Sequence, residues 1–393
     1  MIHIWIGAFV IPALMLLYAV LSALLPGKLG YPRRLSNRQK KSADGIFLPW
    51  LWKLALALAA LCFMLMQSTR MMAEHPQRLM VFAVMLAEAL LAALLIIPVE
   101  RALQEDAVKE TTVTEQAPAK VNLLLNVGRK REDGYHELVS VMQTVGVYDT
   151  LTVTAHTGDG IVLTCDDPDL ATDETNLCYK AAVKFFYYTD IENDGVSIDL
   201  QKRLPMQAGL GGGSADAAAV LRALRRLYAP TLPDSELELM SEDLGSDVPF
   251  CVRGGTALAR GRGEKLETLP ALPRCWFVLV KPDAAFSTGK MYGLIDQRRC
   301  YDEGGAEAIT AALRAGDLRA VCAAMGNTFE RTLAPDSEIF AIRQRLLGLG
   351  ALGVMMSGSG SAVFAIFAEE ETARVAATAL RGSYPKTFCG PSE

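Results

Sequence analysis

The stretch that decides the fold is rich in glycine and reads Pro205-Met206-Gln207-Ala208-Gly209-Leu210-Gly211-Gly212-Gly213-Ser214-Ala215-Asp216-Ala217. Four glycines within five residues favour a loop, because glycine tolerates positive φ and lets a ligand approach the backbone closely. Apolar residues at positions 217, 221 and 224 follow at helical spacing, and Pro230 ends the run. The sequence therefore predicts a loop that leads into a helix N-terminus, where free N–H groups and the helix dipole suit phosphate.

Two better-known glycine motifs do not fit this loop. The Walker motif requires Lys followed by Ser or Thr after its last glycine, but Ser214 and Ala215 follow Gly213. The dinucleotide and protein-kinase pattern G-x-G-x-x-G would require a glycine at position 214. The alternative interpretation of the stretch is a tight strand-to-helix turn that holds no ligand.

The composition predicts two or three domains in a chain of 393 residues. Hydrophobic residues make up 51% of the chain and gather in the first hundred residues, and the net charge of −5 gives no indication of a nucleic-acid partner. The eight cysteines form no C-x-x-C pair and lie at no zinc-ligand spacing to a histidine. We therefore expect buried, reduced thiols.

Three long apolar segments predict three transmembrane helices, at about residues 4–25, 48–66 and 79–99, since about 20 apolar residues cross a bilayer. The loop between the first two carries six Lys and Arg residues against a single acidic residue, which predicts that it faces the cytoplasm. Three crossings then place everything after residue 99 in the cytoplasm. The alternative is three buried helices of a soluble bundle. The charged residues 100–116 are expected to form a linker.

Residues 119–127 alternate between two faces and predict a half-buried strand. One face begins with Lys120 and Asn122, an unusual choice unless that face lines a site. The alternative is a solvated face with an ordinary surface lysine. A basic turn then leads to Tyr135 and His136, which can stack and hydrogen-bond to a planar ring, or can simply cap a turn.

The rest of the chain predicts strands followed by a loop and helices, which favours an α+β fold over a repeating βαβ unit. Further strands are expected at residues 137–145, 150–155, 161–165, 196–200, 276–280 and 363–367, and helices at residues 176–188, 235–244, 288–295, 306–315, 318–324 and 337–347. We expect a domain boundary near residue 275.

Two later features are candidate parts of a site. Asp247 stands between Gly245 and a Val-Pro-Phe run, so its backbone is restrained and it is a candidate base or metal ligand. The alternative is an ordinary turn aspartate. A second glycine-rich turn at residues 356–361 (Met-Ser-Gly-Ser-Gly-Ser) can pack against phosphates or against the first glycine loop.

The order and spacing of these features resemble the GHMP kinases, the family of galactokinase, homoserine kinase and mevalonate kinase. The matching motifs are residues 118–123 (Pro-Ala-Lys-Val-Asn-Leu), the Pro-x-x-x-Gly-Leu-Gly-x-(Gly)-Ser loop at 205–214, and the late glycine turn with its strand at 357–367. Residues 133–136 (Asp-Gly-Tyr-His), 203–206 (Arg-Leu-Pro-Met) and 245–249 (Gly-Ser-Asp-Val-Pro) resemble the branch that phosphorylates a cytidine diphosphate-linked methylerythritol in non-mevalonate isoprenoid biosynthesis.

The resemblance implies a two-domain fold. Residues 117–275 would form an ATP-binding domain that is similar to ribosomal protein S5, and residues 276–393 a ferredoxin-like domain. The apolar residues 1–99 are not part of that family. They can be a membrane anchor, a fusion with an unrelated membrane protein, or two joined reading frames. We expect an inner-membrane protein with a cytoplasmic kinase part, or a cytoplasmic one if residues 1–99 are an artefact of fusion.

The resemblance also implies roles for single residues. Asp247 would accept the proton of the substrate's 2-hydroxyl, and Lys120 would favour the ionised carboxylate and the developing alkoxide. Tyr135 and His136 would hold the cytosine ring, and Asn122 would place the erythritol part. ATP would enter with Mg²⁺ bridging its phosphate oxygens. The residues expected at the phosphates are Pro205, Met206, Gln207, Ala208, Gly209, Leu210, Gly211, Gly212, Gly213, Ser214 and Ala215, with Ser214 as the candidate Mg²⁺ ligand.

Two other functions remain open from the sequence. The same fold can act on another small alcohol, of the homoserine or mevalonate type, although the Gly-Tyr-His turn argues against this. Alternatively, the membrane region does the work and the kinase-like part is a binding module, although the presence of Lys120 and Asp247 argues against an inactive enzyme.

Overall fold

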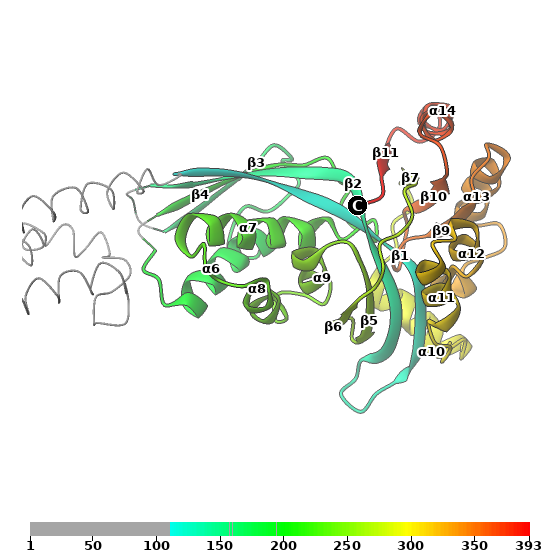
Figure 1. Ribbon diagram of the computed structural model, residues 1–393, viewed down its shortest axis with the longest axis horizontal. Coiled ribbons are helices and arrows are strands. Elements are labelled where there is room, and N and C mark those ends of the chain that lie inside the picture. The colour runs from blue at the N-terminus through cyan, green and yellow to red at the C-terminus, as the bar shows by residue number, and fades with distance from the viewer. Residues whose placement is uncertain (1–110, 157, 159, 194) are drawn as a thin grey trace, which may run out of the picture. The chain divides into compact units, whose positions relative to one another are not determined.

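The computed structural model describes residues 111–393, apart from residues 157, 159 and 194, and Thr111–Glu393 forms one compact unit (Figure 1). The three predicted transmembrane segments, at residues 4–25, 48–66 and 79–99, lie outside the described residues. Among the described helices, none combines the length and the apolar character that crossing a bilayer requires.

A mixed seven-stranded sheet is the larger of two sheets. Its strands are β1 (Thr112–Lys130), β2 (His136–Ala155), β3 (Ile161–Cys165), β4 (Val196–Gln201), β5 (Thr256–Gly261), β6 (Lys265–Thr268) and β8 (Gly326–Asn327). The order is β3-β4-β2-β1-β8, with β5 paired to β2 and β6 to β5. Most pairs are antiparallel, whereas β3 runs parallel to β4 and β8 parallel to β1. The two longest strands, β1 and β2, are therefore central.

Four helices cover one face of this sheet (Figure 1). They are α6 (Leu177–Thr189), α7 (Gly212–Tyr228), α8 (Asp234–Ser241) and α9 (Val248–Arg253). The middle of α7 is buried on almost every side, and Ala218, Leu221 and Leu224 are fully covered in the core between sheet and helices. Burial of these side chains stabilises the fold by about 1.5–3 kcal/mol for each leucine. The glycine loop is thereby attached to a rigidly packed helix.

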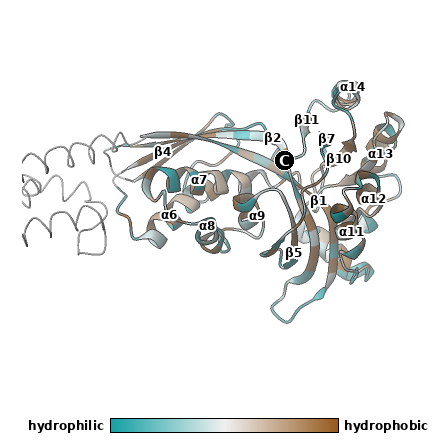
Figure 2. Ribbon diagram, in the orientation of Figure 1, coloured by the Kyte–Doolittle hydropathy of each residue, from teal (hydrophilic) through white to brown (hydrophobic). Residues whose placement is uncertain are grey.

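The second sheet is antiparallel, with the order β11-β7-β10-β9. Its strands are β7 (Trp276–Val280), β9 (Gly353–Met356), β10 (Val363–Phe367) and β11 (Thr387–Pro391); its helices are α10 (Thr288–Arg298), α11 (Glu307–Ala315), α12 (Leu318–Ala323), α13 (Glu338–Gly348) and α14 (Glu370–Arg381). One core cluster contains Val121 of β1 together with Phe277 of β7, so the two sheets share buried apolar contacts. Hydrophobic and hydrophilic residues alternate along many elements, as half-buried elements require (Figure 2).

The observed elements confirm the α+β interpretation but correct two boundaries. Residues 112–116, expected in the linker, belong to β1, where Val113 is buried and Thr112 and Thr114 bond side chain to side chain with β2. Because one face of this segment is polar and exposed, its sequence resembled that of a linker more than that of a strand. Residues 137–155, expected as two strands, form the single strand β2, which passes through a bulge opposite residues 118 and 119. The bulge interrupts the period-two pattern on which the prediction depended.

Candidate active site

The glycine loop borders a cavity of about 450 Å³, a size typical of small-molecule sites. Residues 205–214 all line the cavity, together with Lys202, Asp216 and part of the segment at residues 170–177. Of the eleven residues expected at the phosphates, ten therefore line it; Ala215 is completely buried in α7. The loop needs its glycines, because Gly209 and Gly211 have φ values of +77° and +68°.

The N-terminus of α7 opens onto this cavity. Gly211 is the N-cap residue, and the first N–H groups of any α-helix have no acceptor within the helix. The first turn of α7, which the structure describes completely, contains no acidic residue to compete for these donors. Ser214 lies in this turn and also lines the cavity. The arrangement suits an anion with several oxygen atoms, such as a polyphosphate.

Lys120 and Asp247 form an ion pair against the loop. The Lys120 Nζ lies 3.1 Å from Asp247 Oδ2, and the two side chains are 5% and 31% exposed. The Lys120 N–H donates to the carbonyl of Leu210 at 2.9 Å, and a Cβ added to Gly211 would lie 2.7 Å from Lys120 Cγ. Lys120 therefore passes directly over the loop. Asp247 immediately precedes α9, whose early Pro249 restrains the backbone at this point.

Asn122 holds the lysine in place. Its Oδ1 accepts a hydrogen bond from Lys120 Nζ at 2.9 Å, and its Nδ2 donates to Ser140 Oγ at 2.8 Å. Ser140 in turn donates to the carbonyl of Leu124 at 2.7 Å. The expected contact of Asn122 with substrate stays a prediction, whereas its contact with Lys120 is a property of the fold that the sequence did not indicate.

Tyr135 and His136 lie at the turn between β1 and β2, with different environments. His136 is buried, its Nε2 lies 2.9 Å from Asp296 Oδ1, and its ring stacks on that of Tyr292 with centroids 4.9 Å apart. The hydrogen bond from His136 lowers the pKa of Asp296 below its usual value. Tyr135 is 53% exposed, with the guanidinium of Arg262 5.1 Å from its ring centroid. The exposed aromatic face suits a stacking partner.

Tyr292, on which His136 stacks, is a further aromatic residue of this group. Burial raises the pKa of Tyr292 to about 12, and the charge of Asp247 adds to the shift. The phenol therefore stays protonated near neutral pH. No local sequence pattern marks Tyr292 or Asp296, because their contacts with His136 span more than 150 residues.

The second glycine-rich turn packs against the first glycine loop, as one of the two expected possibilities had it, and its contact with phosphates stays a prediction. Ser357 Oγ donates to the carbonyl of Gly209 at 2.8 Å, and the Ala362 N–H donates to the carbonyl of Ala208 at 3.0 Å. Asn327 Nδ2 donates to the carbonyls of Met356 and Gly358, which fixes the turn itself. The loop is thus held from the second sheet as well as from the first.

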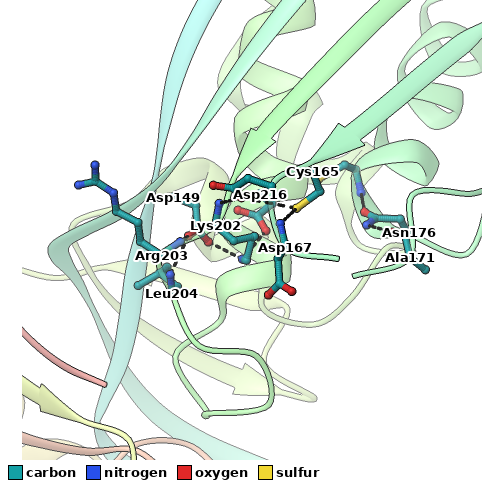
Figure 3. A network of polar contacts seen from close by, with 11 residues as sticks. Asp149, Cys165, Asp167, Ala171, Asn176, Lys202, Arg203, Leu204 and Asp216 are labelled. Atoms are coloured by element: carbon teal, nitrogen blue, oxygen red, sulfur yellow. Dashed lines mark hydrogen bonds and ion pairs between the residues drawn. The ribbon is translucent and has the colours of Figure 1, made fainter. Parts of the chain in front are cut away.

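A buried charge network lies at the other side of the loop (Figure 3). Lys202 Nζ lies 2.5 Å from Asp149 Oδ2 and 2.8 Å from Asp216 Oδ2. Burial raises the pKa of Asp216 to about 7, although Lys202 opposes the shift. Asp216 Oδ1 is buried with no hydrogen-bond partner in the described part of the chain. No sequence pattern indicated this network.

Comparison with known proteins gives consistent matches. The model of the GHMP kinase N-terminal domain matches residues 176–255, and that of the GHMP kinase C-terminal domain matches residues 309–386. A 4-diphosphocytidyl-2-C-methyl-D-erythritol kinase of Exiguobacterium sibiricum is 43% identical over 272 residues, which cover 69% of this chain and 94% of the relative. The kinase of the same name from Macrococcus caseolyticus is 39% identical over 277 residues, covering 70% and 98%.

A solved structure agrees with these relatives. The crystal structure of a 4-(cytidine 5'-diphospho)-2C-methyl-D-erythritol kinase superimposes with a TM-score of 0.62 at 37% sequence identity. The superposition covers 71% of this chain and 99% of that chain. The similarity therefore extends over nearly the whole length of these relatives.

Proposed function

The chain belongs to the GHMP kinase family and is a small-molecule kinase, and we propose that it transfers the γ-phosphate of ATP to the 2-hydroxyl of 4-diphosphocytidyl-2-C-methyl-D-erythritol. This reaction belongs to the non-mevalonate route to isoprenoid precursors. The substrate assignment is supported by relatives of that name at 39–43% identity, which this chain covers almost completely.

The observation that carries the proposal is the Lys120–Asp247 pair beside the glycine loop. Asp247 is partly exposed, so a substrate hydroxyl can reach its carboxylate, which accepts the proton as the oxygen attacks the γ-phosphorus. Lys120, whose Nζ lies 3.1 Å from Asp247 Oδ2, would stabilise the negative charge that develops on the attacking oxygen. The P–O bond to ADP breaks as the new one forms, and Asp247 retains the proton until the product leaves.

The loop supplies the nucleotide site. The backbone N–H groups at the start of α7 would donate to the phosphates of ATP, and the cavity lined by residues 205–214 would hold the nucleotide. Residues 205–214 include no lysine or arginine, so the protein's positive charge near the phosphates would come from Lys120, from Lys202 at the cavity and from the helix N-terminus.

The residues present fit a Mg²⁺ that is bound mainly by the nucleotide. Within residues 111–393, apart from residues 157, 159 and 194, no three His, Cys, Asp or Glu side chains cluster as metal ligands. Mg²⁺ at kinase sites needs only one or two protein ligands in addition to phosphate oxygens and water. We propose the Ser214 hydroxyl, at the cavity, as one of them. When bound, the metal would neutralise charge on the phosphates.

We propose that the substrate's cytosine ring is held at Tyr135 and His136, and that Asn122 lies near its erythritol part. The exposed face of Tyr135 and the fixed imidazole of His136 support this assignment.

The function is tested by assaying the purified chain with ATP and each candidate alcohol. We expect ADP release that depends on 4-diphosphocytidyl-2-C-methyl-D-erythritol, with a new phosphomonoester signal in the phosphorus NMR spectrum of the product. Homoserine and mevalonate are the controls. Turnover of either control, with none of the diphosphocytidyl alcohol, would disprove the substrate assignment and leave the kinase fold intact.

We further propose the domain limits 117–275 and 276–393, and three membrane helices in residues 1–99 that place the kinase part in the cytoplasm. The two family models match on either side of residue 275, which supports the first point. Only the apolar sequence supports the second. Alkaline carbonate extraction of membranes from cells expressing the full chain tests it: an integral protein stays in the pellet, and release into the supernatant would contradict the anchor.

A further inference from the structure

We infer that Lys202, with Asp149 and Asp216, acts as a clamp that joins the two ends of the glycine loop and so positions the loop for the nucleotide. Lys202 immediately follows β4, at the entrance of the loop. Asp216 lies in α7, just after its exit, and Asp149 belongs to the neighbouring strand β2. One ammonium group thus bridges elements on both sides of the loop (Figure 3). The inference rests on the proposed ATP site.

The entrance of the loop is fixed by carboxylates as well as by the lysine. Asp149 Oδ1 accepts hydrogen bonds from the N–H groups of Arg203 and Leu204, at 2.5 and 2.7 Å. Asp166 Oδ1 accepts from the N–H of Lys202 at 2.7 Å. Three consecutive backbone donors are therefore bound to carboxylate oxygens just before the glycines begin. Hydrogen bonds to an ionised acceptor are roughly twice as strong as neutral ones.

The exit of the loop depends on Lys202. Asp216 is buried, and its Oδ2 bonds to Lys202 Nζ. Asp216 Oδ1 has no hydrogen-bond partner in the described part of the chain, and Lys202 is the cation that pairs with this buried carboxyl group. A buried charge that loses its partner must move or take up a proton. Removing Lys202 would therefore release the start of α7, where the phosphate donors lie.

Replacing Asp149 distinguishes a positioning role of the clamp from direct contact with the nucleotide. Lys202 and Asp216 line the cavity and could touch a ligand themselves. Asp149 is completely buried and does not line the cavity, so it can act on the nucleotide only through the groups that it holds, which are the loop entrance and Lys202. Its replacement by Asn keeps the volume but removes the charge and one of the two oxygen acceptors.

The experiment compares Asp149→Asn, Lys202→Met and the pair Asp216→Asn and Asp216→Leu. We expect Asp149→Asn, Lys202→Met and Asp216→Leu to raise KM for ATP about 10- to 100-fold, since small displacements of binding groups have effects of this size. KM for the alcohol should change less than about threefold, because none of the three residues belongs to the proposed alcohol site and its binding groups are not displaced. Asp216→Asn keeps an oxygen that can accept from Lys202 but loses the charge, so its KM for ATP should rise less than that of Asp216→Leu.

Arg222→Met is the matched control. Arg222 also lies on α7 and is partly buried in an ion pair with Glu115, and it donates to the carbonyl of Cys251. The Arg222→Met variant should have a lower melting temperature but an unchanged KM for ATP, because Arg222 does not line the cavity. The double variant Asp149→Asn, Lys202→Met should be no worse than the more severe single change, because both remove the same clamp.

Two outcomes would overturn the inference. An increase in KM for ATP in Lys202→Met alone, with Asp149→Asn and Asp216→Leu unaffected, would mean that Lys202 touches the nucleotide directly. A lower melting temperature in all variants with unchanged KM for ATP would leave only a stabilising role. If Asp149→Asn does not fold, the Asp216 pair decides: a rise in KM for ATP as large in Asp216→Asn as in Asp216→Leu would overturn the clamp, because Asn keeps an acceptor for Lys202. Calorimetric titration with ATP in the absence of any alcohol measures nucleotide binding alone. Its result therefore tests the clamp whether or not the substrate assignment is correct.

Discussion

Replacing Gly211 by alanine is expected to damage stability and catalysis together. Gly211 has a φ of +68°, where an alanine costs about 1–2 kcal/mol. The new Cβ would also lie 2.7 Å from Cγ and 3.1 Å from Cε of Lys120. Because Cγ is near the base of that side chain, the lysine must change rotamer, at a further cost of about 0.5–1.5 kcal/mol. The Lys120 ammonium would then leave Asp247 and Asn122.

We therefore expect Gly211→Ala to lower the unfolding free energy by about 1.5–3.5 kcal/mol, the sum of the two effects. A misplaced catalytic group should reduce kcat about 10- to 100-fold. Thermal unfolding and steady-state kinetics of the purified variant measure the two effects. The kinetic loss should persist at temperatures well below the melting midpoint, where the variant is folded.

Gly213→Ala is the matched control in the same loop. Gly213 lies in the first turn of α7 without a positive φ, and an added Cβ would make an ordinary contact at 3.6 Å with Leu177. Alanine in a helix is preferred over glycine by about 0.5–1 kcal/mol, so this variant should melt at or above the wild-type temperature. If Gly211→Ala matches Gly213→Ala in melting temperature and keeps the wild-type kcat, the reasoning about Lys120 is refuted.

Three further predictions concern the same site. Asp247→Asn should reduce kcat at least about 100-fold, because the base is lost, while calorimetry shows nearly unchanged ATP affinity; retained turnover would mean that another group accepts the proton. Gly209→Ala places a Cβ against the backbone oxygen of Ser357 at a φ of +77°, and should therefore lower the melting temperature more than Gly211→Ala does; equal or smaller loss would show that the two loops separate easily. Burial raises the pKa of Asp216 to about 7, so the folded protein holds a proton there that the unfolded chain has released, and stability should fall as the pH rises from about 4 to 7. Melting temperatures at pH 5 and 8 should differ less in Asp216→Asn, and an equal pH dependence in both proteins would contradict the shift.

Local patterns predicted the elements of this site better than its contacts. The alternation of residues 119–127 placed Lys120 and Asn122 on one face of a strand, and the glycine spacing placed a loop before a helix. The contacts of Asp149 and Asp216 with Lys202 were not predicted, because they join residues that are 53 and 14 positions apart in the chain. Period and turn signals report only neighbours within about one turn or one strand. The pairing of Lys120 with Asp247 was expected from resemblance to a family, since neither residue by itself differs from an ordinary surface or turn residue.

The strand β2 shows the same limit in another form. Its bulge ended the alternation that the sequence offered, so the prediction divided one strand into two. Yet the bulge is close to Asp149, which must turn its carboxyl group toward the backbone at residues 203 and 204. Bulges re-aim side chains and are frequent beside active sites. The bulge that interrupts the alternating pattern thus lies close to Asp149, the residue that binds the backbone at the entrance of the glycine loop.

The glycine loop is held from three independent directions, and this explains how a loop without charged side chains can present its backbone donors to a phosphate. The N–H of Lys120 binds Leu210 from the first sheet, Ser357 binds the carbonyl of Gly209 from the second glycine-rich turn, and Lys202 joins the two ends. Glycine residues lose more conformational entropy on ordering than any others. Because these contacts order the loop before the ligand arrives, that entropy is lost on folding and not on binding. The donors at the start of α7 can then meet a charged transition state without further rearrangement.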